Sequence, residues 1–102
     1  MTLREHLLTC LIEECAEVQK AVSKALRFGL DDGYPKSGRT NRQDIEEELL
    51  DVLSVMWILA DKGIIRQFHQ TEIDAALMDK RDKVETWLKY ARSRMAMAEE
   101  KG

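Results

Sequence analysis

Residues 49–60 are apolar on nearly every side when they are drawn as a helix, and only Asp51 and Ser54 interrupt them. A helix of that kind is stable in water only when other helices surround it. The rest of the chain offers few neighbours, so we expect a partner subunit to complete the core. The length of 102 residues fits a single domain over residues 1–102, whose own core is modest.

Apolar residues recur at helical spacing in three long segments. We predict helices over about residues 3–28, 41–62 and 71–96, separated by turn-forming residues. The first two helices begin with capping-box pairs, and the third begins with Thr71 as its cap. One proline and five glycines leave little material for a turn-rich β fold. The predicted fold is an all-α helical bundle with antiparallel packing, and a break near residues 80–82 would divide the third helix and give four.

The charge and cysteine content narrow the functional classes. A net charge of −3 and an isoelectric point near 5.4 argue against a general nucleic-acid binder but do not exclude a nucleotide substrate. Cys10 and Cys15 are badly spaced for a local disulfide, and the first residues do not resemble a secretory leader. We therefore expect a reducing, cytoplasmic setting. The longest apolar run, residues 52–60, is too short to span a bilayer.

Two carboxylates stand where a core helix should be apolar. Glu14 lies on the apolar stripe of the first helix, and Asp51 lies in the most apolar part of the second. Glu17 and Glu48 lie one turn from them, so each helix presents a pair of carboxylates at i, i+3. If the two helices pack antiparallel through these stripes, the four carboxylates converge.

Four converging carboxylates need to be neutralised. Two such charges about 4 Å apart repel by about 1 kcal/mol in bulk water and by about 4 kcal/mol at an effective dielectric constant of about 20. A hard divalent cation removes this repulsion. A ligand set made only of oxygen, without His or Cys, favours Mg²⁺ or its substitute Mn²⁺ over Zn²⁺.

Solvated helix faces are the alternative explanation for acidic runs. We favour that explanation for Glu13, Glu46 and Glu47, whose charges suit exposed pairing with Lys or Arg. We reject it for Glu14 and Asp51, because buried carboxylates without a partner are rare.

Basic residues interrupt the apolar stripe of the third helix in the same way. Lys80 and Arg81 stand where an apolar residue is due, and Lys83 lies one turn further along. Lys80 could hold a substrate phosphate, or its stem could cross apolar surface so that its ammonium group reaches solvent. The pattern supports both roles equally.

Aromatic and basic residues near the connecting loop could recognise a nucleotide. Trp57 on the second helix could stack on a base, although core packing is the role that we favour. The loop residues could close over a nucleotide or merely keep the loop soluble. These residues are Tyr34, Lys36, Arg39 and Arg42.

The first predicted helix carries EECAE at residues 13–17, and the second carries ELLD at residues 48–51. These segments resemble the EExxE and ExxD motifs of the MazG-like nucleotide pyrophosphohydrolases, which belong to the all-α NTP pyrophosphatase superfamily. Residues 80–90 also look like the lysine-bearing third helix of that family. The resemblance therefore spans nearly the whole chain.

The resemblance implies a hydrolase that converts a nucleoside or deoxynucleoside triphosphate and water to the monophosphate and pyrophosphate, in nucleotide-pool house-cleaning. It makes Glu13 a candidate for a second metal or for orienting water, and it makes Lys80 and Lys83 phosphate contacts. It further implies a homodimer or homotetramer. The Mg²⁺ ligands that it implies are Glu14, Glu17, Glu48 and Asp51.

Three other functions compete with this one. Phosphoribosyl-ATP pyrophosphohydrolase shares the size, the helices and the acidic motifs, but the basic loop and the lysine-rich third helix favour the MazG-like enzymes. A helical interaction module without activity would have no reason to place a carboxylate at Asp51. A carboxylate-bridged di-iron bundle ranks last, because such sites use a Glu-x-x-His element that this sequence lacks.

Overall fold

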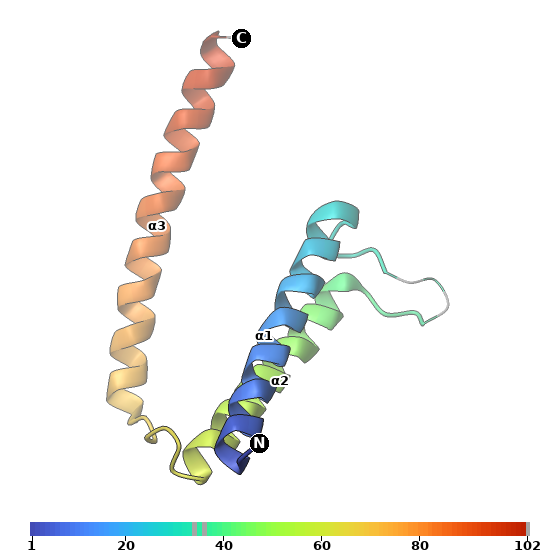
Figure 1. Ribbon diagram of the computed structural model, residues 1–102. Coiled ribbons are helices and arrows are strands. Elements are labelled where there is room, and N and C mark those ends of the chain that lie inside the picture. The colour runs from blue at the N-terminus through green and yellow to red at the C-terminus, as the bar shows by residue number, and fades with distance from the viewer. Residues whose placement is uncertain (34, 36, 102) are drawn as a thin grey trace. The chain divides into compact units, whose positions relative to one another are not determined.

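In the computed structural model the described residues form three helices and no strand, as the all-α prediction requires (Figure 1). Helix α1 spans Leu3–Phe28, α2 spans Asn41–Asp61 and α3 spans Gln70–Lys101. The structure describes residues 1–33, 35 and 37–101, with side chains described as far as residue 95. Tyr34 and Lys36, expected near a nucleotide, lie outside the described residues. No helix in the described part is long and apolar enough to cross a membrane.

Capping boxes begin both α1 and α2, as the sequence predicted. The Thr2 hydroxyl accepts the Glu5 N–H at 3.1 Å, and the Glu5 carboxylate accepts the Thr2 N–H at 3.3 Å. Thr40 and Gln43 repeat the exchange at 3.2 and 2.9 Å. Gly29 ends α1 with a φ of 99°, which favours glycine. Both predicted helices therefore begin where expected, and α1 also ends where expected.

Helix α3 begins at Gln70, so Thr71 lies inside its first turn and is not the predicted cap. His69 is the residue before the helix, and its carbonyl oxygen accepts the Glu72 N–H at 3.1 Å. The His69 N–H in turn donates to the Glu72 carboxylate at 2.8 Å. Glu72 therefore fixes the helix start three residues before itself, as the acidic member of a capping box does.

Helix α3 continues without interruption through residues 80–82, so the four-helix alternative is wrong. Lysine and arginine are good helix formers, and neither breaks a helix by being charged. The Lys83 ammonium and the Asp79 carboxylate also form an i, i+4 ion pair at 3.1 Å that spans this segment. The helix extends past the predicted end near Ala96.

The chain divides into two compact units, Met1–Gln67 and Phe68–Gly102. In the first unit α1 and α2 lie side by side and run antiparallel, as predicted (Figure 1). Their contact buries Ala21 and Ala25 of α1 and Leu59 of α2. Small alanine side chains allow a close approach of the two helices, and this approach positions the side chains described below.

Asn41 fastens the start of α2 to the end of α1. Its side chain is only 4% exposed, and its Nδ2 donates to the Gly29 carbonyl oxygen at 2.8 Å. Its backbone N–H donates to the Asp32 carbonyl oxygen at 2.6 Å. Gly33 lies so close to the Arg39 carbonyl that a Cβ atom there would collide with it. The base of the connecting loop is therefore closed by backbone contacts.

We expect Asn41→Ala to lower the free energy of unfolding by about 1–3 kcal/mol, because it leaves the partly buried Gly29 carbonyl oxygen without its donor. Chemical denaturation followed by circular dichroism measures the change. Arg42→Ala is the matched control, since the side chain of Arg42 makes an exposed ion pair with Asp31 and the substitution keeps the backbone hydrogen bond to Leu30. That variant should lose no more than about 1 kcal/mol. Equal losses in the two variants would contradict the role of Asn41.

Candidate metal centre

Three carboxylates converge where α1 and α2 touch. Glu14 comes from α1, Glu48 and Asp51 come from α2, and one carboxylate oxygen of each lies within 4.8 Å of the other two. Among the residues that the structure describes, this is the one group of His, Cys, Asp or Glu side chains gathered closely enough to hold a metal ion. The predicted convergence of acidic residues across the two helices is therefore present for these three.

Helical geometry explains why these side chains meet. Glu14 follows Leu11 and precedes Val18 on the face of α1 that turns toward α2, and all three are half-buried. Glu48 and Val52 lie on the face of α2 that turns toward α1, and they are also half-buried. The antiparallel contact thus brings Glu14 and Glu48 to one level of the helix pair.

Asp51 is exposed in this chain, whereas Glu14 and Glu48 are half-buried. The expectation that Asp51 is buried is therefore wrong for the single chain. Its position three residues after Glu48 turns it about 60° away from the line of contact with α1. Asp51 still belongs to the group, because one of its carboxylate oxygens lies within 4.8 Å of the other two carboxylates.

The pKa of the Glu48 carboxyl is raised above its ordinary value of 4.5. Partial removal of water around Glu48 is the largest cause, followed by the negative charges of Asp51, Glu17 and Glu14, and then of Glu47. Each cause disfavours the ionised form of Glu48. A cation bound beside Glu48 would act in the opposite direction and favour its ionised form.

Glu17 and Glu13 are not part of the group of three. Glu17 is exposed, but it lies close enough to Glu48 to contribute to the raised pKa. Glu13 is also exposed, as the alternative of a solvated helix face predicted. The structure thus brings three of the four predicted ligands together and places the fourth, Glu17, in their electrostatic neighbourhood.

The donor set suits a hard divalent cation. All three groups offer carboxylate oxygen, which is the donor that Mg²⁺ and Mn²⁺ prefer. Opposite oxygen ligands of an octahedral Mg²⁺ lie about 4.2 Å apart. Small rotations of the side chains would therefore bring oxygens that lie within 4.8 Å of one another into coordinating distance.

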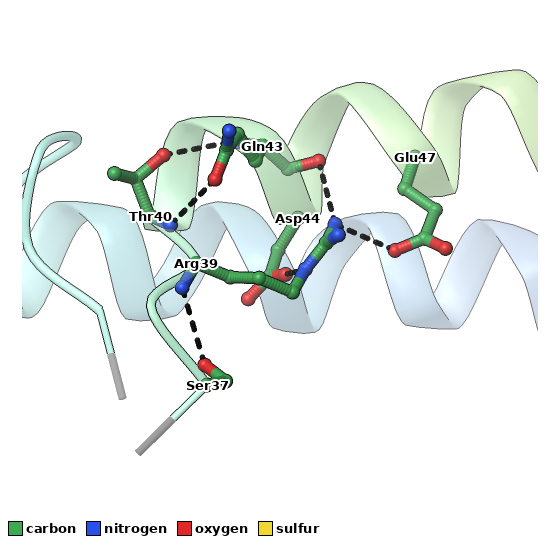
Figure 2. Close-up of polar contacts among 6 residues, drawn as sticks. All are labelled: Ser37, Arg39, Thr40, Gln43, Asp44 and Glu47. Atoms are coloured by element: carbon green, nitrogen blue, oxygen red, sulfur yellow. Dashed lines mark hydrogen bonds and ion pairs between the residues drawn. The ribbon is translucent and has the colours of Figure 1, made fainter. Parts of the chain in front are cut away.

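Arg39 is held by carboxylates at the end of the connecting loop (Figure 2). Its Nε donates to Asp44 at 3.1 Å, and its guanidinium also donates to Glu47 at 2.7 Å and to the Gln43 carbonyl oxygen at 3.5 Å. The hydrogen bond to Asp44 and then the charge of Glu47 raise the pKa of Arg39. The Arg39 N–H donates to the Ser37 hydroxyl at 3.3 Å. Arg39 therefore joins the loop to α2.

The pairing of Arg39 confirms that Glu47 belongs to a solvated face paired with arginine. Asp44 is a contact that the sequence reasoning missed. The signal that could have found it is an arginine just before the helix start, followed by an acidic residue in the first turn.

The remaining predicted substrate residues are exposed. Lys80 and Lys83 lie on α3, where Lys83 pairs with Asp79. Trp57 is 71% exposed, so α1 does not cover it, and the favoured core role stays a prediction that needs a further helix over this side of α2. Its position two residues from both Val55 and Leu59 turns it to the side of α2 that faces away from α1.

The raised pKa of Glu48 predicts how the stability of the metal-free protein depends on pH. Above pH 4.5 and up to the pKa of Glu48 in the folded state, the folded chain binds more protons than the unfolded chain. Its stability should therefore fall as the pH rises through this window. Glu48→Gln should flatten that part of the curve, and Glu46→Gln should not. Thermal melts in a chelator at low salt test this, and identical curves for wild type and Glu48→Gln would contradict it.

Comparison with known protein families assigns the chain to one of them. Residues 3–86 match the family model of the MazG nucleotide pyrophosphohydrolase domain, and this span includes both acidic motifs as well as Lys80 and Lys83. A search of curated proteins and a search of solved structures each returned no match. Because the matched span covers most of the 102 residues, the chain belongs to the MazG nucleotide pyrophosphohydrolase domain family.

Proposed function

We propose that this chain is a Mg²⁺-dependent enzyme that converts a nucleoside or deoxynucleoside triphosphate and water to the monophosphate and pyrophosphate. The observation that supports this most is the group of Glu14, Glu48 and Asp51 in a chain of the MazG family. Such an activity suits the removal of unwanted nucleotides. We place it in the cytoplasm, where the free thiols of Cys10 and Cys15 would stay reduced.

Glu14, Glu48 and Asp51 would hold the ion, with Glu17 as the fourth ligand. When bound, Mg²⁺ or Mn²⁺ neutralises phosphate oxygens and lowers the pKa of a coordinated water. The four carboxylates fix the place on the helix pair at which the triphosphate is held. They also repel a triphosphate that arrives without a cation, and this makes the activity depend on the metal.

The reaction forms a bond between a water oxygen and the α-phosphorus and breaks the bond to the bridging oxygen, so pyrophosphate leaves. Glu13 is exposed and adjoins Glu14 in sequence. We assign to Glu13 the task of orienting the water and accepting its proton. The negative charge that develops on the bridging oxygen needs a positive partner.

Basic side chains provide candidates for that partner. Lys80 and Lys83 are exposed on α3, and we assign them to the phosphates on the strength of the family resemblance. Arg39 could contact a phosphate only by exchanging its bonds to Asp44 and Glu47. The exchange is feasible because all three side chains are more than a third exposed, and exposed ion pairs are weak.

Trp57 is our candidate for contact with the base. Its indole ring is 71% exposed on α2, the helix that also carries Glu48 and Asp51. An exposed indole offers a flat apolar surface on which any base can stack. Stacking of this kind does not discriminate strongly between bases, so other groups would set the base preference.

A second copy would cover an apolar face of the first unit and give a homodimer, or a homotetramer built from it. On each helix, the residues that contact the other helix form a stripe. Exposed apolar residues occupy the sequence positions directly after the members of that stripe, so they are turned about 100° around the helix axis from the contact. Because α1 and α2 are antiparallel, both rotations lead to the same side of the pair. The carboxylates of Asp51 and Glu17 turn to the opposite side. The face consists of Leu8, Ile12, Val22 and Leu26 of α1 and Leu49 and Leu53 of α2.

We expect Asp51→Asn to lower the rate of Mg²⁺-dependent pyrophosphate release by about 100-fold or more, because loss of a metal ligand matters at least as much as loss of an outer partner. The substitution keeps the shape of the side chain. Glu46→Gln on the same helix, exposed and outside the group, is the matched control and should retain activity. Circular dichroism should show unchanged helix content in both. Full activity of Asp51→Asn would contradict the proposed metal site.

A pyrophosphate-release screen tests the function itself. The substrates are dUTP, dCTP, dTTP, ATP, GTP, oxidised nucleotides and phosphoribosyl-ATP, each with and without Mg²⁺. The proposal expects release from at least one nucleoside triphosphate and none without the cation. Release from phosphoribosyl-ATP alone would show that the chain is a phosphoribosyl-ATP pyrophosphohydrolase of histidine biosynthesis. No release from any substrate would favour a helical interaction module without activity.

A further inference from the structure

Arg39 is held on the side of α2 that also carries Asp51 (Figure 2). Its guanidinium donates from Nε to Asp44 at 3.1 Å and from Nη2 to Glu47 at 2.7 Å. Asp44 lies seven residues before Asp51 and Glu47 lies four residues before it, so both lie within about 40° of Asp51 around the helix axis. These residues all belong to the unit Met1–Gln67, and their arrangement is therefore defined within that unit.

The guanidinium of Arg39 lies about one helical turn from the candidate metal centre. Side chains four residues apart on a helix have Cβ atoms about 5–6 Å from each other, and Glu47 and Asp51 have this spacing. The negative charge of Glu47 is also among the causes of the raised pKa of Glu48. Glu47, and the guanidinium bound to it, are thus close neighbours of the carboxylates that would hold the ion.

The backbone of Arg39 is fixed by contacts that do not involve its side chain. Its carbonyl lies against Gly33, where a Cβ atom would collide with it. Its N–H donates to the Ser37 hydroxyl at 3.3 Å, and the next residue, Thr40, is the N-cap of α2. The guanidinium can therefore change partners by rotation of its own side chain, without opening of the loop.

A triphosphate held at the metal centre would compete with both carboxylates for this guanidinium. Arginine binds phosphate through paired, charge-assisted hydrogen bonds, and a phosphate chain carries more negative charge than one carboxylate. The ion pairs of Arg39 with Asp44 and Glu47 are exposed, and exposed ion pairs are weak. The phosphate would therefore win Arg39, but its net gain is reduced by the two pairs that it must replace.

We propose that Asp44 and Glu47 are positioning residues that hold Arg39 one turn from the metal centre until a triphosphate displaces them, and that they thereby weaken substrate binding. The inference rests on the proposed function, which supplies the triphosphate. Arg39 makes the phosphate contact, and the two carboxylates act through Arg39 alone. Removal of either carboxylate should therefore strengthen binding, and only while Arg39 is present.

A double-mutant cycle isolates the role of Arg39. Glu47→Gln keeps the size of the side chain and removes the partner at 2.7 Å. It also removes a negative charge that repels any phosphate, whether or not Arg39 binds it. Arg39→Gln measures that second effect by itself, because the competition is absent from this background. The part of the gain that disappears with Arg39 is the part that the competition causes.

Isothermal titration of the full-length protein with inorganic tripolyphosphate at saturating Mg²⁺ provides the dissociation constants. We expect Glu47→Gln to bind about threefold more tightly than the wild type, because one exposed ion pair no longer competes. In the Arg39→Gln background the same substitution should change the dissociation constant by less than about 1.5-fold. With a nucleotide that the pyrophosphate-release screen finds active, Glu47→Gln should lower KM by the same factor and change kcat less.

Glu46→Gln is the matched control, because it removes the same charge from the neighbouring position. Glu46 is exposed and lies about 140° from Asp51 around the helix. This variant should bind tripolyphosphate like the wild type. A gain equal to that of Glu47→Gln would contradict the proposal.

Nuclear magnetic resonance of the arginine side chains shows the exchange directly. The Nε–H signal of Arg39, assigned by its absence in Arg39→Gln, should shift when magnesium tripolyphosphate is added, because Nε then loses Asp44. The Nε–H signal of Arg42, which donates to Asp31 at 3.4 Å, is the internal reference and should stay in place.

The proposal is overturned if Glu47→Gln strengthens binding equally with and without Arg39, because lower negative charge alone would then explain the gain. It is also overturned if the wild type does not bind magnesium tripolyphosphate, or if the Arg39 signal does not move. Failure of the proposed function has a different result. Coupling between Glu47 and Arg39 without hydrolysis of any nucleotide would support the competition and contradict the enzyme, and hydrolysis without coupling would contradict the competition alone.

Discussion

The contact between α1 and α2 brings three like charges to within 4.8 Å of one another, and the account of this chain depends on that contact. The two helices approach through Ala21 and Ala25, and Asn41 fixes where the second helix starts. The same approach that buries these residues forces Glu14 toward Glu48. The pKa of Glu48 is raised by partial removal of water and by the neighbouring carboxylates, so its ionised form is disfavoured there. A bound cation would reduce the repulsion between the carboxylates. The packing of the two helices and a metal-binding role are therefore connected, because the packing brings these negative charges together and a cation would neutralise them.

Few of the described side chains of the first unit are buried, and this explains why association enters the proposed function. Among the described residues, the buried apolar ones are Ala21, Ala25 and Leu59. Burial of so few apolar side chains contributes little to offset the entropy cost of ordering the backbone. The first unit has apolar side chains of α1 and α2 along one side of the helix pair that neither of these two helices covers. On the first unit that face turns away from the carboxylates, so a second copy could cover it and leave the metal centre open to substrate.

Local patterns in the sequence predicted the helices well, because capping boxes and helical spacing act within a few residues. The same spacing predicted that Glu14 and Glu48 converge, since residues on facing stripes must meet. Contacts that depend on tertiary geometry were harder to foresee. Asp51 proved exposed because it lies at the rim of the contact, and Trp57 because one chain leaves the outer side of α2 uncovered. The partners of Arg39 depend on how the loop returns to the helix, and short patterns do not encode that path.

The measurement that tests the central claim most directly is a crystal structure of the protein grown with Mn²⁺, with anomalous scattering used to locate the ion. The account predicts an anomalous peak between the two helices, about 2.0–2.3 Å from carboxylate oxygens of Glu14, Glu48 and Asp51. A structure in which Mn²⁺ binds elsewhere, or in which Glu14 and Asp51 point into solvent on different sides of the helix pair, would contradict it.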